Sequence, residues 1–239
     1  MPFKIPDNLL ANPDRKSAFA GIREWMQQEM TSARMAVDGA VSSGCRAIDE
    51  ALGGGYAPGK ITEIVEPLPS RGGQSLIHES IRLSREKQQF IALVDACNQF
   101  DPNSDIQAYL QCLLWVRCPK PGDALKACDI LIRDGNFPLL YLDLRLMDRY
   151  AGNRIRPNEW YRLQRVSEQS RIAFVVFTSA STVPCAGNRL RLEPSLNLSF
   201  LDYPERVAVE QLKCAVLKRR MLSDLPEASS VQPIAMGFN

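Results

Sequence analysis

The stretch EIVEPLPSRGGQSLI, residues 63–77, joins a segment typical of a buried strand to one typical of a helix through a turn rich in proline and glycine. Loops of the form GxxxxGK[ST], which bind nucleotide phosphates, occur in this context, between a strand and the start of a helix. Set on the eight residues ending at Ser75, however, the pattern finds Leu68 for its first glycine and Gln74 for its lysine. The stretch is therefore either an altered phosphate loop or an ordinary turn.

Apolar runs alternate with helical segments on both sides of this loop. The expected strands cover residues 60–66, 90–95, 114–117, 137–144 and 171–179. The expected helices cover residues 45–55, 74–88, 104–114, 121–135 and 156–170. Buried strands separated by helices indicate an α/β fold with a mostly parallel sheet. Beyond residue 187, the segments NRLRLEPSLNLSF and RVAVEQLKCAVLKRR alternate with period two, which predicts antiparallel strands that close the sheet.

Three regions divide the chain. Residues 1–38 are expected to form an N-terminal arm with one amphipathic helix, whose apolar positions are Phe19, Ile22, Trp25, Met26 and Met30. Residues 39–220 form the expected core domain. The tail, residues 221–239, is rich in small polar residues and proline and is expected to be flexible.

Composition excludes several classes of protein. The chain has 239 residues with 45% hydrophobic and 23% charged residues, which is typical of a globular protein with a real core. Its net charge of +2 means that any nucleic-acid binding must rest on a local patch. Seven scattered cysteines and a single histidine, His78, give no metal-site spacing and no disulfide framework. No stretch approaches the roughly 18 apolar residues of a membrane span, so the sequence predicts a cytoplasmic protein that does not contact membranes.

The serial order of three motifs over roughly residues 42–200 resembles the RecA family core. These motifs are IDEALGGGYAPGKITEI (48–64), LVDACNQFDP (93–102) and DALKACDILIRDGNFPLLYLDL (123–144). The resemblance implies a three-layer α/β RecA-like core. It also places Asp143 where the family organises a metal ion, and Gly72, Gly73, Gln74 and Ser75 where the nucleotide loop lies.

Several departures from that family concern the chemistry of ATP hydrolysis. Gln74 stands for the lysine whose charge draws in the phosphates. Cys97 stands for the glutamate that activates water, and a cysteine is no equivalent base. If the alignment is anchored on EIVEP instead, Glu66 falls at the first glycine and the loop is longer than that of the family. Pro67 and Pro69 remove two backbone N–H donors from the loop. The sequence therefore predicts a protein that is not an ATPase, with neither ATP nor magnesium as cofactor and no other metal.

Within this superfamily the chain resembles the ImuA group, the RecA/SulA-like accessory proteins of bacterial DNA-damage mutagenesis. The short length, the altered loop, NRLRLEP (188–194) and a strand ending in LKRR (217–220) carry this resemblance. It implies a non-catalytic role in SOS-type translesion DNA synthesis. The implied partners are subunits of an error-prone polymerase, such as an ImuB-like protein, together with RecA and single-stranded DNA.

A local excess of arginine suggests where DNA would bind. Seven arginines lie between Arg145 and Arg171, and the segment RYAGNRIRPNEW combines cations with aromatic residues. Cations bind phosphates and aromatic rings stack on bases. The candidate nucleic-acid-binding residues are Arg149, Tyr150, Arg154, Arg156 and Trp160. The alternative is a solvated helix face with i,i+4 ion pairs. His78 has no evident partner in the sequence and is expected to be an ordinary helix residue.

Two other functions stay open at this point. One is a nucleotide-dependent switch or ATPase that uses Ser75 and Asp143 with a cation from elsewhere, such as Arg71 or Lys60. The other is a SulA-like inhibitor of cell division that binds a tubulin-like protein. Binding of ATP tests the first, and filamentation of cells on overexpression tests the second.

Overall fold

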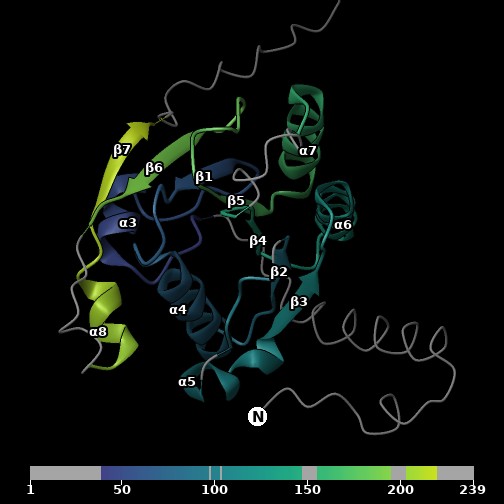
Figure 1. The fold of residues 1–239 in the computed structure, drawn as a ribbon. Coiled ribbons are helices and arrows are strands. Elements are labelled where there is room, and N and C mark those ends of the chain that lie inside the picture. The colour runs from purple at the N-terminus through teal and green to yellow at the C-terminus, as the bar shows by residue number, and fades with distance from the viewer. Residues whose placement is uncertain (1–38, 97, 103, 147–154, 195–202, 220–239) are drawn as a thin grey trace, which may run out of the picture.

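A seven-stranded sheet forms the centre of the molecule. The computed structural model describes residues 39–219 apart from 97, 103, 147–154 and 195–202. The strand order is β3-β2-β4-β5-β1-β6-β7. The strands are β1 (Ile61–Val65), β2 (Ile91–Asp95), β3 (Leu113–Arg117), β4 (Leu139–Asp143), β5 (Ala173–Thr178), β6 (Asn188–Leu192) and β7 (Cys214–Lys218). All neighbouring pairs are parallel except β6 and β7 (Figure 1).

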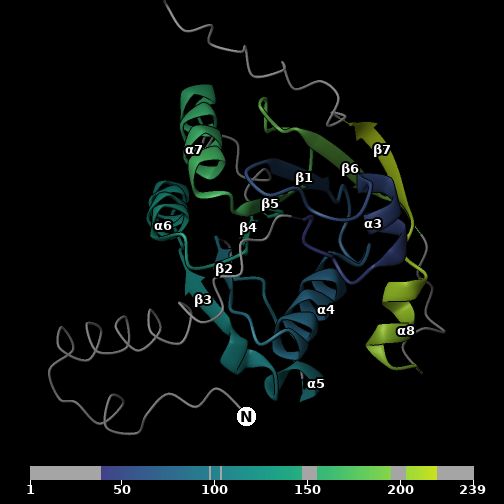
Figure 2. The same ribbon diagram turned by 180° about the vertical axis from the view of Figure 1, so that it is seen from behind.

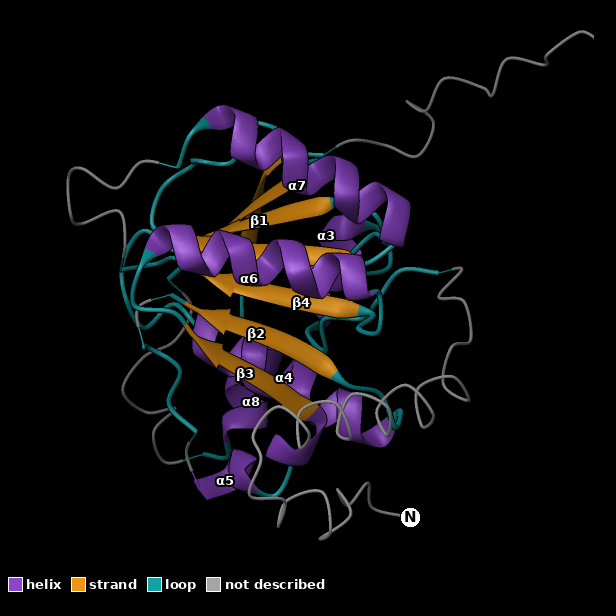
Figure 3. Cartoon of the chain, turned by 90° about the vertical axis from the view of Figure 1, so that its right-hand side faces the viewer, coloured by secondary structure: helices purple, strands orange, loops and turns teal. Residues whose placement is uncertain are grey.

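Helices cover both faces of this sheet. They are α3 (Arg46–Leu52), α4 (Gly73–Glu86), α5 (Ser104–Gln107), α6 (Pro121–Asp134), α7 (Pro157–Ser170) and α8 (Glu205–Glu210), with a 3₁₀ turn, η1 (Leu110–Cys112). Figure 3 shows α6 and α7 side by side over one face, with α4 and α8 behind the sheet. Figure 2 gives the view from behind, with α3 close to the β6–β7 edge. The molecule is thus a three-layer α/β fold.

The apolar residues of the strands explain the three layers. Leu140 and Leu142 of β4 pack into the core under α6 and α7, whereas Leu139 and Tyr141 pack into the core under α3, α4 and α8. Successive side chains of a strand point to opposite faces, so a strand that is buried on both faces must be apolar throughout. All five positions of β4 are buried. This is why the strands appear in the sequence as continuous apolar runs.

The five central strands and most of the helices between them confirm the pattern expected from the sequence. The helix expected over residues 104–114 was wrong in extent, because α5 ends at Gln107, η1 follows, and β3 begins at Leu113. Two expectations near the C-terminal end need correction. Strand β6 pairs antiparallel with β7, as expected for the closing strands, but it runs parallel to its other neighbour, β1. The segment RVAVE was expected to be extended, yet Glu205–Glu210 is a helix. Ala208 and Val209 are buried on one side of it, and that packing outweighs the period-two pattern.

Some expectations fall on residues outside the described part of the chain. These are the N-terminal arm and helix, the C-terminal tail, residues 149–154 of the segment 149–160 proposed to bind DNA, and residues 195–200 of the first closing segment. Within the described part, no helix is both long enough and apolar enough to cross a membrane.

Candidate functional site

The altered loop lies at the carboxyl edge of the parallel sheet, between β1 and α4. Strand β1 ends at Val65, and α4 begins at Gly73 after Gly72, whose φ of +96° is a left-handed conformation that favours glycine. Ligands of open α/β sheets bind outside the carboxyl ends of the strands. The loop therefore occupies the place where such a fold would bind a nucleotide.

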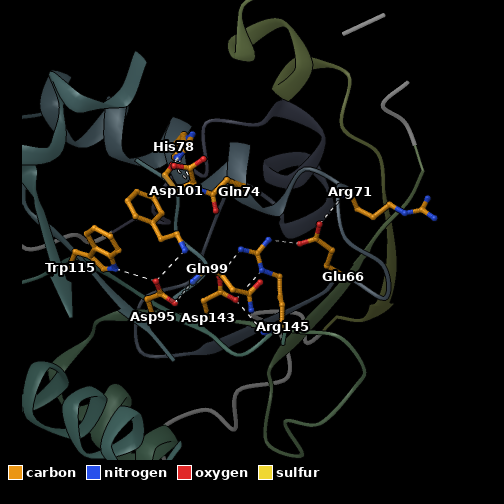
Figure 4. Close-up of polar contacts among 11 residues, drawn as sticks. Glu66, Arg71, Gln74, His78, Asp95, Gln99, Asp101, Trp115, Asp143 and Arg145 are labelled. Carbon is orange, nitrogen blue, oxygen red and sulfur yellow. Dashed lines mark hydrogen bonds and ion pairs between the residues drawn. The ribbon is translucent and has the colours of Figure 1, made fainter. Parts of the chain in front are cut away.

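Glu66, the first residue of this loop, is buried and turned inward. Its Oε1 accepts a hydrogen bond of 2.9 Å from the backbone N–H of Arg71. Its Oε2 accepts a hydrogen bond of 2.6 Å from Nη1 of Arg145 (Figure 4). A phosphate loop binds its anion through backbone N–H groups and a cation. Here a carboxylate of the chain itself receives one bond of each kind.

The same arginine also binds Asp143 at the end of β4. Arg145 Nε lies 2.9 Å from Asp143 Oδ1, and Nη2 lies 2.5 Å from Oδ2. This is the two-pronged geometry in which a guanidinium binds a carboxylate most strongly. The guanidinium carbon of Arg145 is 5.3 Å from the centre of the Phe177 ring on β5. Arg145 thus reaches from β4 across β5 to the loop that follows β1.

Electrostatics explain why three charges remain in this buried place. The Arg145 side chain is only 11% exposed, and Asp143 is fully buried. Burial by itself would lower the pKa of Arg145, but the carboxylates of Asp143 and Glu66 outweigh it and raise that pKa above its usual value. The arginine therefore stays cationic. Since one cation faces two carboxylates, the cluster keeps an excess of negative charge.

The two glycines of the loop are in close contact with this cluster and with α8. A Cβ added at Gly73 would overlap Glu66 Oε2 and lie 2.6 Å from Arg145 Nη1. A Cβ added at Gly72 would overlap the Leu212 side chain, which follows α8. Real Cβ atoms do not approach other atoms this closely. A side chain at either position would therefore force Leu212, or Glu66 and Arg145, to move.

Gln74 and His78, one turn apart on α4, form a second polar group. Gln74 Nε2 donates to the backbone oxygen of Asp101 at 3.1 Å and lies 2.8 Å from Nε2 of His78. Nδ1 of His78 lies 2.9 Å from the carboxylate of Glu205 on α8. Nε2 of His78 also lies 3.0 Å from the backbone oxygen of Asp101, so both ring nitrogens have polar partners. The expectation that His78 is an ordinary helix residue without a partner was therefore wrong.

A third buried carboxylate, Glu63, lies in the middle of β1 and was not singled out from the sequence. Its Oε1 accepts hydrogen bonds from the N–H groups of Thr182 at 2.7 Å and Val183 at 3.2 Å. Its Oε2 accepts from Arg189 Nε at 2.5 Å. These bonds fix the short connection between β5 and β6. A charged residue inside an otherwise apolar strand is the signal that could have revealed this contact.

The expected nucleotide-loop residues come together in space. Gly72, Gly73, Gln74 and Ser75 lie at the start of α4, and Asp143 reaches the same cluster through Arg145. Cys97 lies outside the described residues. Arg145, which the sequence offered only as one member of an arginine-rich segment, is the residue that joins the two parts.

The expected DNA-binding residues have a different outcome. Arg149, Tyr150 and Arg154 lie outside the described residues, and Arg156 is exposed just before α7. Trp160 is only 2% exposed and belongs to the core under α6 and α7, so its ring is not available for stacking on a base. Its neighbour Tyr161 is 57% exposed. Of these two aromatic residues of α7, only Tyr161 exposes its ring, and the sequence had pointed to Trp160 instead.

A small cavity opens beside the ion cluster, and we call it the loop cavity. It measures about 210 Å³, whereas pockets for small-molecule ligands span roughly 300–1,000 Å³. Its lining residues are Glu66, Pro67, Pro69, Ser70, Gln74, Gln99, Asp101, Arg145, Leu146 and Ser179. Among the described residues, no group of three or more His, Cys, Asp or Glu side chains is arranged to hold a metal ion.

Comparisons with known proteins identify distant relatives. No protein-family profile matches the chain. It is 35% identical to protein RecA of Chlorobaculum parvum over 112 residues, which cover 44% of this chain and 30% of that protein. The match to RecA of Chlorobaculum tepidum is also 35% identical, over 111 residues, 43% of this chain and 30% of that protein. The matched region thus spans less than a third of these relatives.

The architecture provides the second comparison. The crystal structure of the RadB recombinase superposes with a TM-score of 0.56 at 18% identity, covering 75% of this chain and 90% of that one. At this identity the superposition shows the fold alone. Together with the local identity to RecA, it shows that the chain has a RecA-like fold and is a distant relative of RecA.

Proposed function

We propose that this chain is a RecA-like protein without ATPase activity that acts by binding other macromolecules. The observation that carries the proposal is the position of Arg145 between Glu66 and Asp143. A nucleotide with its magnesium ion would bring phosphate to the loop and a cation to Asp143. In this chain the loop N–H of Arg71 donates to Glu66 and Asp143 binds Arg145, and both contacts support the proposal.

Binding ATP would require breaking these contacts at a cost in free energy. The Arg71 N–H would have to leave Glu66, and Asp143 would have to exchange a buried two-pronged bond with Arg145 for a magnesium ion. Removing one partner of a buried ion pair typically costs about 3–5 kcal/mol. Gln74, which replaces the phosphate-binding lysine, supplies no charge in return.

The finer proposal concerns the process in which the protein acts. The resemblance of its altered loop and C-terminal segments to the ImuA group supports an accessory role in SOS-type translesion synthesis. The protein would connect an error-prone polymerase, through a subunit such as an ImuB-like protein, with RecA or single-stranded DNA. The exposed Arg156 at the start of α7 is compatible with contact to a DNA phosphate.

Genetic complementation tests this role. In a host that carries the gene, its deletion should lower damage-induced mutagenesis, and the parent gene should restore it. The variant Ser75→Ala should restore it, because its side chain would serve no nucleotide. Failure of this variant, when it is present at the level of the parent, would favour a nucleotide-dependent switch instead. Cell filamentation on overexpression would favour the SulA-like alternative.

A further inference from the structure

The loop cavity has the opposite charge from a phosphate site. Glu66 and Asp101 line it, and Asp143 lies directly behind Arg145. Glu66 and Asp143 share the guanidinium of Arg145, whereas Asp101 is exposed and no contact pairs its carboxylate with that cation among the described residues. Figure 4 shows the side chain of Arg71, on the same loop, extending away from the cluster. The cavity is therefore electronegative, and it repels phosphate groups and attracts cations.

One wall of the cavity is formed by a preorganised part of the loop. Pro67 and Pro69 line the cavity, and Leu68 between them is 55% exposed. Proline fixes φ and so limits the conformations of the chain on both sides of Leu68. The base of the loop is held by the bond from the Arg71 N–H to Glu66. A partner that contacts such a wall loses little free energy in ordering it.

The wall of the cavity also has an unused donor. Gln99 Nε2 is buried and has no hydrogen-bond partner within the described part of the chain. A buried donor without an acceptor costs free energy that a ligand can recover by supplying one. A metal ion or a simple cation offers no acceptor, whereas the backbone of a peptide has one at every residue.

We propose that the loop cavity receives an arginine side chain from a protein partner. The guanidinium would pair with the exposed carboxylate of Asp101 and the negative charge around Glu66, and a backbone carbonyl of the same segment would accept from Gln99. Apolar residues next to the arginine would cover Leu68. An arginine anchored in a pocket with an apolar surround is a common centre of protein interfaces.

This proposal rests on the proposed function, since it places a protein partner where a nucleotide would lie. It also explains the volume of the cavity, which is small for a nucleotide and suits one side chain. Arginine is preferred to lysine because its planar guanidinium binds carboxylates with two parallel bonds and is more weakly hydrated.

An NMR titration of the full-length ¹⁵N-labelled protein tests the proposal. The probe is N-acetyl-arginine amide, and its matched control is the neutral isostere N-acetyl-citrulline amide. The arginine probe should shift the amide signals of Ser70, Gln99, Asp101 and Ser179 with a millimolar Kd that weakens in salt. The citrulline probe should bind at least about tenfold more weakly, because the attraction is between charges.

A pair of carboxylate variants locates the site. Asp101→Asn should weaken binding of the arginine probe about three- to tenfold. Its backbone oxygen still accepts from Gln74, so the fold should be retained. The control, Asp123→Asn on α6, also removes one carboxylate charge, but Asp123 does not line the cavity. It should leave the Kd of the arginine probe unchanged.

Two results would overturn the proposal, and a third would overturn its premise. Equal shifts from both probes, or no shifts at these amides, would show that the cavity does not select a guanidinium and would leave the proposed function standing. Shifts of the same amides by ATP with magnesium would show that the site still binds nucleotide, and the proposed function itself would then be wrong.

Discussion

Arg145 and Glu66 are 79 positions apart in the sequence, yet Nη1 of the arginine lies 2.6 Å from the carboxylate of the glutamate. Glu66 begins the loop that in a RecA-like fold would hold phosphate, and Arg145 follows the strand that ends in Asp143. The ion pair thus joins the loop that follows β1 to the end of β4.

Replacing Arg145 should strongly destabilise the protein. Arg145→Met keeps most of the volume of the side chain but leaves the carboxylates of Glu66 and Asp143 buried without a cation. We expect the free energy of unfolding to fall by about 3–5 kcal/mol, as measured by urea denaturation at pH 7.

The matched control is Arg133→Met on α6. Arg133 also binds a carboxylate, Asp129, but this pair lies at the surface. Solvent screens such pairs, so the control should change stability little. If both variants had similar stability, the cluster at the loop would not be a stabilising element.

Restoring the missing lysine should not restore nucleotide binding. In Gln74→Lys the new ammonium would lie next to His78 and the backbone oxygen of Asp101, which now hold Gln74. One added charge does not remove Glu66 or free the N–H of Arg71. We expect no ATP-dependent shift in Tm for Gln74→Lys, with Gln74→Met as the uncharged control. An ATP-dependent rise in Tm in the lysine variant alone would show that the Glu66–Arg145 ion pair does not prevent nucleotide binding.

Stability should fall at alkaline pH partly through Cys128. Burial raises the pKa of this thiol well above its usual value. Because the folded pKa is raised, the unfolded chain loses the thiol proton first, at its pKa of about 8.5. The free energy of unfolding is therefore unaffected below that pH and falls as pH rises above it, by up to about 1.4 kcal/mol per pH unit. The stability of the parent should therefore decline more steeply between pH 8 and 10 than that of Cys128→Ala. Parallel pH profiles would contradict this assignment.

Binding to single-stranded DNA should depend on Arg149, Arg154 and Arg156. Replacing all three by alanine should weaken binding and reduce the slope of log K against log salt by up to about three units. Fluorescence anisotropy of a labelled oligonucleotide measures both. Unchanged binding by the triple variant would mean that this segment is only a solvated surface.

Trp160 should not be used to test DNA stacking. It lies in the core under α6 and α7, so Trp160→Ala should lower the free energy of unfolding by about 3–5 kcal/mol. Tyr161→Ala is the informative variant, because its exposed ring can be removed without a cavity. We expect Tyr161→Ala to fold like the parent in a thermal melt.

The central sheet could be predicted from the sequence because its strands are buried on both faces. Continuous apolar runs such as FIALVD and FPLLYLDL, bounded by turn residues and separated by helices, are typical of such buried parallel strands. The closing segments were harder. Alternation along NRLRL is the same whether a strand runs parallel or antiparallel to its neighbour, and the RVAVE segment becomes a helix through its contacts with α4.

The contents of the site could be predicted only in part. The loss of the lysine and the presence of Glu66 are visible in the sequence, and they predict a loop that binds phosphate poorly. The contact of Glu66 with Arg145 depends on a strand order that places β5 between β1 and β4. The partner of His78, Glu205, lies 127 positions away. Such contacts arise from the tertiary fold, which local patterns do not contain.

A thermal-shift titration with ATP and magnesium tests the central claim most directly. A ligand that binds only the folded state must raise Tm as its concentration passes its Kd. Because Glu66 accepts from the N–H of Arg71 and Arg145 binds both Glu66 and Asp143, we predict no rise in Tm for the unmodified protein at millimolar ATP. A saturable rise that requires magnesium would contradict this account and would show that the loop still binds a nucleotide.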